Sequence, residues 1–183
     1  MRTATFDELG KGGELVKQRE PILILQQGLP IGYFRALPDP DESIPIAADT
    51  MVIMSAATGG AAARVFKAPA ITVVTTDFNM GDVKQHLPPL IDKYCLDPDD
   101  VADALASLPL RIYRWDEYES PLAEARVQME WKDPKDVALL ALSLKLGIDV
   151  WSQDLHYDAL AVKRTTTGQI LKSLQVRGQV STL

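Results

Sequence analysis

Four aspartates that lie far apart in the chain are the residues best placed to do chemistry. Asp49 directly follows a predicted strand, and Asp154 comes three residues after another predicted strand ends. Asp82 and Asp136 fall in the first turns of two predicted helices. Because functional sites of open α/β sheets form at the carboxyl ends of the strands, we expect these four side chains to project from one edge of the same sheet.

Carboxylates that converge in this way need a compensating cation. Like charges in one cleft repel and raise each other's pKa. Oxygen ligands without sulfur or imidazole favour Mg²⁺ or Mn²⁺, which can turn water into a nucleophile and stabilise charge on a phosphoryl group. Each acid taken singly also has a structural interpretation, since acids in first helical turns cap backbone amides. The four together favour the metal site.

Elements of two kinds must position these acids. Beyond residue 43, predicted strands alternate with predicted helices, which indicates a parallel sheet covered on both faces. The predicted strands are 44–48, 71–75, 110–113, 148–151 and 160–163. The predicted helices are 52–66, 81–94, one that opens at Asp97-Pro98, 121–129, 134–146 and 167–175. The helix over 134–146 is apolar almost all round, so we expect it to be buried.

The first 38 residues predict a separate small α+β module. A short helix over 5–19 is followed by two apolar runs, 22–25 and 31–34, which flank a turn containing Gly28 and Pro30 and therefore predict a hairpin. Such a module buries too little to stand alone, so we expect it to dimerise or to dock. A stiff acidic linker over 39–43 separates it from the domain over 44–183.

Composition narrows the class of protein. The net charge is −6, with +1 in residues 1–38 and −7 in the rest, which argues against non-specific coating of nucleic acid. No apolar run approaches the length of a membrane span, and the first residues do not resemble a secretory signal. One cysteine, Cys95, excludes an internal disulfide and fits a reducing cytoplasm.

Residues 44–175 resemble a PIN domain of the VapC-like ribonucleases. The resemblance is carried by AADTMVIMSAA, TTDFNMGDVKQHLPPL, WKDPKDVALLALSLKLGIDVWSQDLHY and TTTGQILKSL. It implies a three-layer α/β fold and a toxin-type endoribonuclease that acts on RNA with Mg²⁺ or Mn²⁺. The acidic quartet that would bind one or two ions is Asp49, Asp82, Asp136 and Asp154. Ser152 would assist beside Asp154, and Asp133 would be a nearby acid.

This sequence departs from the family pattern at two positions. Met51 stands where Asn or Ser is frequent, and Asp82 stands where Glu is more usual. A PIN scaffold without catalysis is therefore the alternative hypothesis.

Residues 3–37 are similar to the N-terminal part of Phd/YefM-type antitoxins, through their helix, apolar strand, polar turn and second strand. The similarity implies a homodimer and binding of operator DNA through residues 1–38. Under the alternative hypothesis this module is the active part and regulates transcription. A sheet edge with four acids favours the ribonuclease, because a scaffold has no need of them.

Three other residues have simpler interpretations. His156 could orient a phosphate, but a histidine at this position is more often a solvated loop residue, which is the interpretation we favour. Cys95 follows an apolar helix face and is expected to pack in the interior. Trp151 lies in a predicted central strand and is expected in the core.

Overall fold

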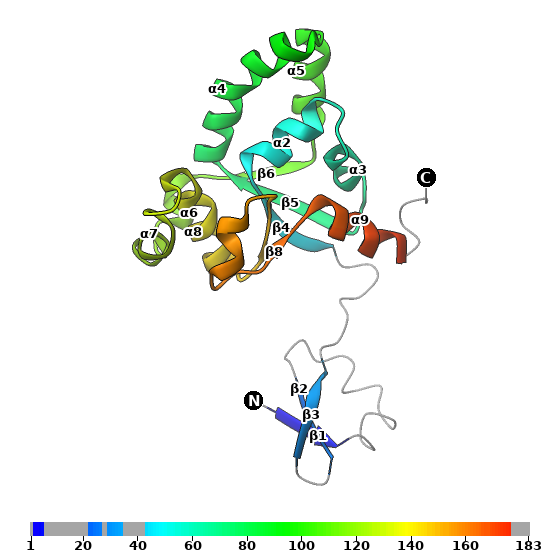
Figure 1. The fold of residues 1–183 in the computed structure, drawn as a ribbon, viewed down its shortest axis with the longest axis vertical. Coiled ribbons are helices and arrows are strands. Elements are labelled where there is room, and N and C mark those ends of the chain that lie inside the picture. The colour runs from blue at the N-terminus through cyan, green and yellow to red at the C-terminus, as the bar shows by residue number, and fades with distance from the viewer. Residues whose placement is uncertain (1, 6–21, 27–28, 35–42, 177–183) are drawn as a thin grey trace. The chain divides into compact units, whose positions relative to one another are not determined.

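The computed structural model describes residues 2–5, 22–26, 29–34 and 43–176 (Figure 1). The chain divides into two compact units, Met1–Glu42 and Ser43–Leu183. The helix predicted over 5–19 and most of the predicted linker over 39–43 lie outside the described residues.

The first unit contains a three-stranded sheet in the order β1-β2-β3. Strands β2 (Ile22–Gln26) and β3 (Leu29–Phe34) pair antiparallel, with a register shift between Ile24 and Leu25. The predicted hairpin is therefore confirmed. Strand β1 (Arg2–Thr5) pairs parallel to β2. The sequence pattern did not predict this strand, because RTAT lacks the apolar run that marks the other two.

The second unit is built on a five-stranded, wholly parallel sheet in the order β6-β5-β4-β7-β8. Its strands are β4 (Ile44–Ala48), β5 (Ile71–Thr76), β6 (Leu110–Tyr113), β7 (Asp149–Trp151) and β8 (Arg164–Thr165). The first four were predicted to within one residue. The strand predicted over 160–163 is wrong, because the pairing residues follow it and the segment before it is the 3-10 helix η3 (Leu155–Ala159).

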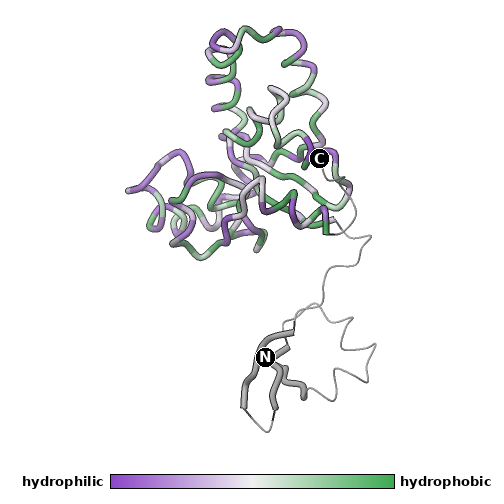
Figure 2. The backbone as a smooth tube through the Cα atoms, turned by 45° about the vertical axis from the view of Figure 1, so that its right-hand side comes forward, coloured by the Kyte–Doolittle hydropathy of each residue, from purple (hydrophilic) through white to green (hydrophobic). Residues whose placement is uncertain are grey.

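Helices cover both faces of this sheet, as the alternation of buried residues along the strands requires. One core contains Ile46, Val73 and Trp151 and lies against the helices within residues 50–107 and the last helix, Thr167–Val176. The other contains Ala47 and Val150 and packs against the helices within residues 115–146. In Figure 2 hydrophobic residues run through the interior of this unit and hydrophilic residues mark its outer turns. The predicted three-layer α/β fold is confirmed, and Trp151 is fully buried as predicted.

The single helix predicted over 52–66 is wrong, since the structure has two helices there. Helix α2 (Thr50–Ala57) ends before Gly59, whose φ of +79° few residues other than glycine adopt, and α3 (Ala62–Phe66) follows. At Gly60, an added Cβ would lie 2.8 Å from the backbone oxygen of Ser55. Two adjacent glycines therefore divide an alanine-rich stretch that propensity alone reads as continuous.

Helices α4 and α5 follow β5 and form the arm at the top of Figure 1. Helix α4 (Asp77–Tyr94) begins four residues before the predicted start, because the Thr76 hydroxyl accepts a hydrogen bond from the Asn79 amide at 3.0 Å and caps the helix. Helix α5 (Pro98–Ser107) has Asp97 as its predicted N-cap. Cys95 lies between them, exposed and left-handed at φ 50°, so the prediction that it packs in the interior is wrong.

The remaining helices include the most deeply buried one. Helix α6 (Trp115–Tyr118) was not predicted, and α7 (Leu122–Met129) was. The predicted helix over 134–146 is the 3-10 turn η2 (Pro134–Asp136) followed by α8 (Val137–Leu146), which ends at Gly147. Every residue from Val137 to Ser143 is buried, and α9 (Thr167–Val176) ends the described chain. Within the described ranges, no helix is long and apolar enough to cross a membrane.

Candidate metal centre

The order of the strands creates a crevice between β4 and β7. From β4 the chain passes to β5 on one side, whereas β7 leads to β8 on the other side. Such a reversal of strand order opens a crevice at the carboxyl ends of parallel strands, and ligands of open α/β sheets bind there. Asp49 directly follows β4, and Ser152 directly follows β7. The candidate site is therefore at the switch point of this sheet.

Asp49 is held rigidly at the start of α2. It is the N-cap of that helix, and its Oδ1 accepts a hydrogen bond from the Val52 amide at 2.7 Å. The side chain is buried, with 8% of its surface exposed. Burial raises the pKa of the Asp49 carboxyl, a hydrogen bond from Ser152 and the Val52 amide lower it, and the charge of Asp154 raises it further. The hydrogen bond that caps α2 lowers the free-energy cost of burying the Asp49 carboxylate but does not cancel it.

Among the predicted site residues, Asp136 has a strongly raised carboxyl pKa. It lies where η2 meets α8, at the N-terminal end of the buried helix. Burial raises the pKa of Asp136 to about 7, and the charges of Asp133, Asp49 and Asp154 act in the same direction. Asp133 from the same turn, together with Asp49 and Asp154 from two other segments, therefore lies close enough to repel the Asp136 carboxylate. A cation bound among these carboxylates would offset their mutual repulsion.

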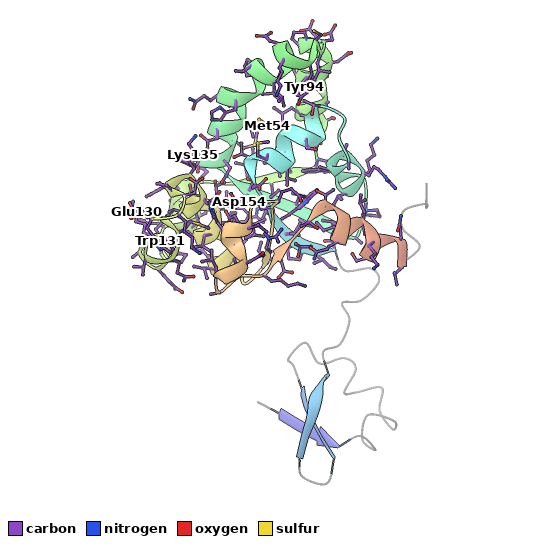
Figure 3. All side chains as sticks on the ribbon, viewed as in Figure 1. Met54, Tyr94, Glu130, Trp131, Lys135 and Asp154 are labelled. Carbon is purple, nitrogen blue, oxygen red and sulfur yellow. The ribbon has the colours of Figure 1, made fainter. Side chains whose placement is uncertain are left out.

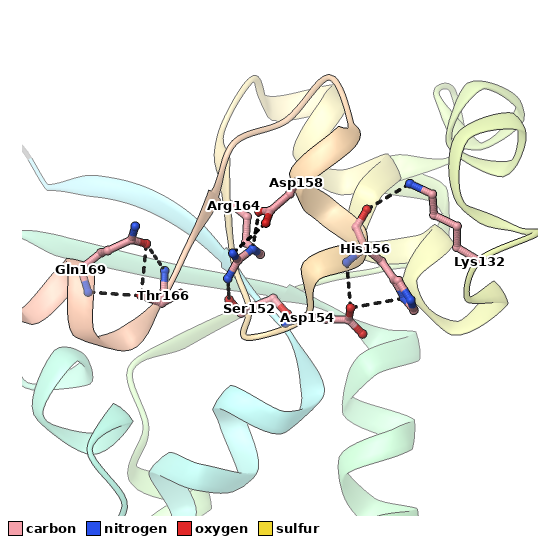
Figure 4. Close-up of polar contacts among 8 residues, drawn as sticks. All are labelled: Lys132, Ser152, Asp154, His156, Asp158, Arg164, Thr166 and Gln169. Carbon is pink, nitrogen blue, oxygen red and sulfur yellow. Dashed lines mark hydrogen bonds and ion pairs between the residues drawn. The ribbon is translucent and has the colours of Figure 1, made fainter.

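Asp154 and Ser152 occupy the loop after β7 (Figure 4). Ser152 is fully buried, and its Oγ accepts a hydrogen bond from the Asp154 amide at 2.9 Å. Oδ1 of Asp154 accepts from the His156 amide at 2.8 Å and lies 3.3 Å from Nδ1 of the same histidine. The Ser152 hydroxyl is also close enough to Asp49 to lower the pKa of that carboxyl.

Tyr157 was missed by the sequence reasoning. It is fully buried, and its hydroxyl has no partner of hydrogen-bond distance and angle among the described residues. That hydroxyl is nevertheless close enough to Asp136 to lower the pKa of the carboxyl. Burial raises the pKa of Tyr157, and so do the charges of Asp136, Asp49 and Asp154. A buried hydroxyl that points at an acid cluster without a completed hydrogen bond calls for a further ligand there.

Asp82 joins this site less closely than predicted. It is half-buried on α4 and lines the same cavity, of about 720 Å³, as the other three acids. It is not among the residues whose charges most strongly raise the pKa of Asp49 or Asp136. Helix α4 begins at Asp77, so Asp82 stands in the second turn rather than the first. The charges of three of the four predicted acids therefore act on one another, and the fourth acid lines the same cavity.

Other residues around the cavity were given no role from the sequence. Lys135 stands beside the acids, and its Nζ lies 3.5 Å from Nε2 of His86 on α4. Lys93 is a third basic side chain on the cavity wall. Apolar side chains, Met54 among them, line the wall between (Figure 3). The cavity is therefore lined by acidic, basic and apolar side chains together.

The donor set fits a hard divalent cation. It consists of carboxylates with the hydroxyls of Ser152 and Tyr157 nearby and no thiolate, which suits Mg²⁺ or Mn²⁺. The high pKa of Asp136 and the orphaned hydroxyl of Tyr157 are both relieved by a positive charge at this position. Asp49, Asp136 and Asp154 are the residues that would hold it.

The fold and site define an α/β protein with an acid-lined crevice at the switch point of a parallel sheet. The sequence matches the PIN domain profile over residues 47–175. The chain therefore belongs to the PIN-domain family, which confirms the resemblance predicted for residues 44–175. The Phd/YefM-like resemblance of residues 3–37 lies outside this match and stays a prediction.

Comparison with solved structures finds VapC20 of Mycobacterium tuberculosis, described as a toxin that cleaves the sarcin–ricin loop. It is 21% identical, the alignment covers 64% of this chain and 95% of that chain, and the TM-score is 0.43. At that score the likeness carries no weight beside the family match. No curated protein matches the sequence.

Proposed function

We propose that this PIN-domain protein is a metal-dependent endoribonuclease of the toxin–antitoxin type, which hydrolyses RNA phosphodiester bonds with Mg²⁺ or Mn²⁺. The observation that carries the proposal is the convergence of Asp49, Asp136 and Asp154. The charge of Asp154 raises the pKa of Asp49, and the charges of Asp49 and Asp154 raise the pKa of Asp136. Family membership supports a nuclease rather than another use of a cation. A bound divalent ion supplies Lewis acidity toward the phosphoryl oxygens and activates water for attack on phosphorus.

The residues of this chain would position the reactants. Asp49 is fixed by the Val52 amide, and the Ser152 hydroxyl fixes the loop that carries Asp154 by accepting from the Asp154 amide. Rigid placement of ligands lowers the entropy that must be lost when the substrate binds. Lys93, Lys135 and His86 offer positive or hydrogen-bonding groups to the sugar–phosphate backbone of RNA.

The apolar wall of the cavity supports a substrate with an unstacked base. Met51, Met54 and Leu90 line it, and Met51 is 61% exposed. A cavity of about 720 Å³ accommodates a nucleotide, and a base removed from a helix can bury its faces against such side chains. We accordingly expect an RNA that is single-stranded at the cleavage point.

Cleavage assays with the full chain test the proposal. The chain is incubated with a single-stranded RNA in Mn²⁺, in Mg²⁺ and in EDTA, beside the Asp49→Asn variant. Internal cleavage with either ion, and none with EDTA or in the variant, is expected. Circular dichroism checks that the variant is folded. A wild-type protein that cleaves no RNA with either ion, or a variant that cleaves as well as wild type, would contradict the proposal.

We further propose that the unit Met1–Glu42 acts as an antitoxin-like module that mediates homodimerisation and binds operator DNA. The hairpin β2–β3 supports this, since both β1 and β3 are edge strands of a small sheet and can pair with a second copy. Sedimentation of the full chain should give a dimer, and a gel shift with the DNA upstream of the coding sequence should give a retarded band. If the chain is a monomer and does not shift this DNA, the module is neither a dimerisation module nor a DNA-binding module.

A further inference from the structure

A histidine joins two acids on one side of the candidate site. Asp133, Asp136 and His156 each offer one ligand atom, and these three atoms all lie within 4.8 Å of one another. They come from two segments, since Asp133 and Asp136 begin and end the turn η2 and His156 lies in η3. Ligand atoms about 2.1 Å from one ion lie roughly 3–4.2 Å apart, so small side-chain adjustments would let all three reach the same ion.

Nothing basic neutralises this group. In the described part of the chain, no ion pair involves Asp133 or Asp136. The nearest lysines contact other atoms, since Nζ of Lys132 donates to the backbone oxygen of His156 at 3.3 Å and Lys135 contacts His86. Among the neighbouring charges, that of Asp133 contributes most to the raised pKa of Asp136. The two carboxylates therefore repel one another without a counter-charge.

A further residue beside this cluster also points to a ligand at this place. The Tyr157 hydroxyl is fully buried close to Asp136, and it has no partner of hydrogen-bond distance and angle among the described residues. Buried hydroxyls in native proteins nearly always have a partner, and an unpaired one marks the place of an absent water or ion. Tyr157 directly follows His156 in η3, so the same short segment brings the imidazole and the orphaned hydroxyl to the cluster.

We propose that Asp133, Asp136 and His156 form a second divalent-cation site, beside that of Asp49 and Asp154, which selects Mn²⁺ or another imidazole-binding transition ion over Mg²⁺. The selectivity follows from the nitrogen ligand, because Mg²⁺ is bound almost wholly by oxygen whereas transition ions accept imidazole. The proposal rests on the proposed function for the first ion, with which it shares Asp136. It assigns His156 a role that its place in an exposed loop does not suggest.

A competing explanation is that His156 only pairs with Asp154. Its Nδ1 lies 3.3 Å from Oδ1 of that acid, and 46% of the imidazole surface is exposed. In that case the imidazole balances one carboxylate and contributes nothing to ion binding. The two explanations differ in how many ions the protein binds, which can be measured without any nuclease assay.

The test is a titration of the full chain with Mn²⁺, followed by the electron paramagnetic resonance signal of the free ion. Wild type is expected to bind two Mn²⁺ ions, and His156→Ala to lose one of them through a weakening of about 100-fold. His86→Ala is the matched control, since it removes the other histidine of the chain, which lines the cavity near the acids, and it should keep both ions. Excess Mg²⁺ should displace one ion from wild type more readily than the other.

Two further variants separate this proposal from the proposed function. Asp133→Asn should lose the same ion as His156→Ala, whereas Asp49→Asn should lose the other ion. If wild type and His156→Ala bind the same number of Mn²⁺ ions with the same affinity, the second site is overturned while the first stands. If wild type binds no Mn²⁺ at all, both proposals fail. Thermal unfolding of each variant in EDTA confirms that the fold is kept.

Discussion

Two aspartate–tyrosine pairs lie at the carboxyl edge of this sheet, and they differ in whether their hydrogen bonds are complete. Asp77, which follows β5, accepts from the Tyr118 hydroxyl at 2.7 Å and from the amides of Phe78 and Trp115. Asp136 faces the Tyr157 hydroxyl without a completed hydrogen bond and is surrounded by other acids. Asp77 is a finished structural contact that ties α4 to α6, whereas Asp136 belongs to a group that is incomplete without a cation.

The comparison teaches how to separate functional acids from structural ones when both stand at the same sheet edge. Position alone does not distinguish them, because Asp77 and Asp49 each come directly after a strand of the sheet. The number of hydrogen bonds that each carboxylate accepts distinguishes them. A carboxylate whose oxygens already accept hydrogen bonds from the protein has no free lone pair for an ion. The following predictions test or refine that distinction.

The largest expected difference is in catalysis. Asp136→Asn should lower the rate of RNA cleavage in Mn²⁺ roughly 1,000-fold, because it removes a shared ligand worth several kcal/mol of transition-state stabilisation. Asp77→Asn should leave the rate within about threefold of wild type. Single-turnover kinetics at saturating Mn²⁺ measure both. Equal losses in the two variants would abolish the distinction between the pairs.

The tyrosines should differ in the opposite sense, in stability. Tyr118→Phe removes a hydrogen bond to a carboxylate and should lower the free energy of unfolding by ~2 kcal/mol. Tyr157→Phe in EDTA should change it by less than ~1 kcal/mol, since the hydroxyl it removes has no completed hydrogen bond to lose. Urea denaturation of both variants gives the comparison. A loss at Tyr157 as large as that at Tyr118 would mean that its hydroxyl is paired.

The raised pKa of Asp136 predicts how stability depends on pH when no metal is present. The folded chain holds the Asp136 proton up to a pKa of about 7, against 3.8 for the ordinary side chain. The folded state therefore binds this proton more tightly than the unfolded state. It follows that the free energy of unfolding falls as the pH rises between these values, and it stays reduced above them.

Asp136→Asn should remove that dependence. Between about pH 5 and pH 8 in EDTA, wild type should lose ~1–2 kcal/mol more than the variant, after allowance for solvent screening of a side chain that is only partly buried. Urea denaturation at the two pH values measures the difference. Parallel behaviour of the two proteins would show that Asp136 is not held against its neighbours' charges.

The smallest expected change in cleavage rate shows whether Asp82 resembles the functional Asp136 or the structural Asp77. It lines the cavity but stands apart from the cluster. Asp82→Asn should therefore lower the cleavage rate about three- to tenfold, equivalent to ~1 kcal/mol. A loss as large as that of Asp136→Asn would place Asp82 among the essential ligands.

Much of the fold could be predicted from the sequence because its strands are short apolar runs and its helices carry clear caps. Asp97-Pro98 and Gly147 mark a helix start and a helix end that the structure confirms. The division at Gly59-Gly60 was missed because the surrounding alanines favour one long helix. Strand β8 was misplaced because a two-residue edge strand has no periodicity to detect.

The candidate site was predictable only as far as chain position allows. That Asp49, Asp136 and Asp154 come together follows from their places after parallel strands and at helix starts. Tyr157 and His156 could not be assigned in this way, because their contribution depends on how the 3-10 turn η3 directs two neighbouring side chains. No periodicity encodes that direction. The signal was the adjacency of His156 and Tyr157 to Asp154, which becomes informative only once the turn is known.

Asp136 directly precedes helix α8, in which every residue from Val137 to Ser143 is buried. A carboxylate mounted on such an element has no room to retreat from its neighbours. Packing of the hydrophobic core during folding therefore brings the Asp136 carboxylate close to the other acids. The carboxylates are already in position before an ion binds. A substitution deep in α8, far from any ligand, should for that reason weaken the preorganisation of the centre as surely as a change beside it.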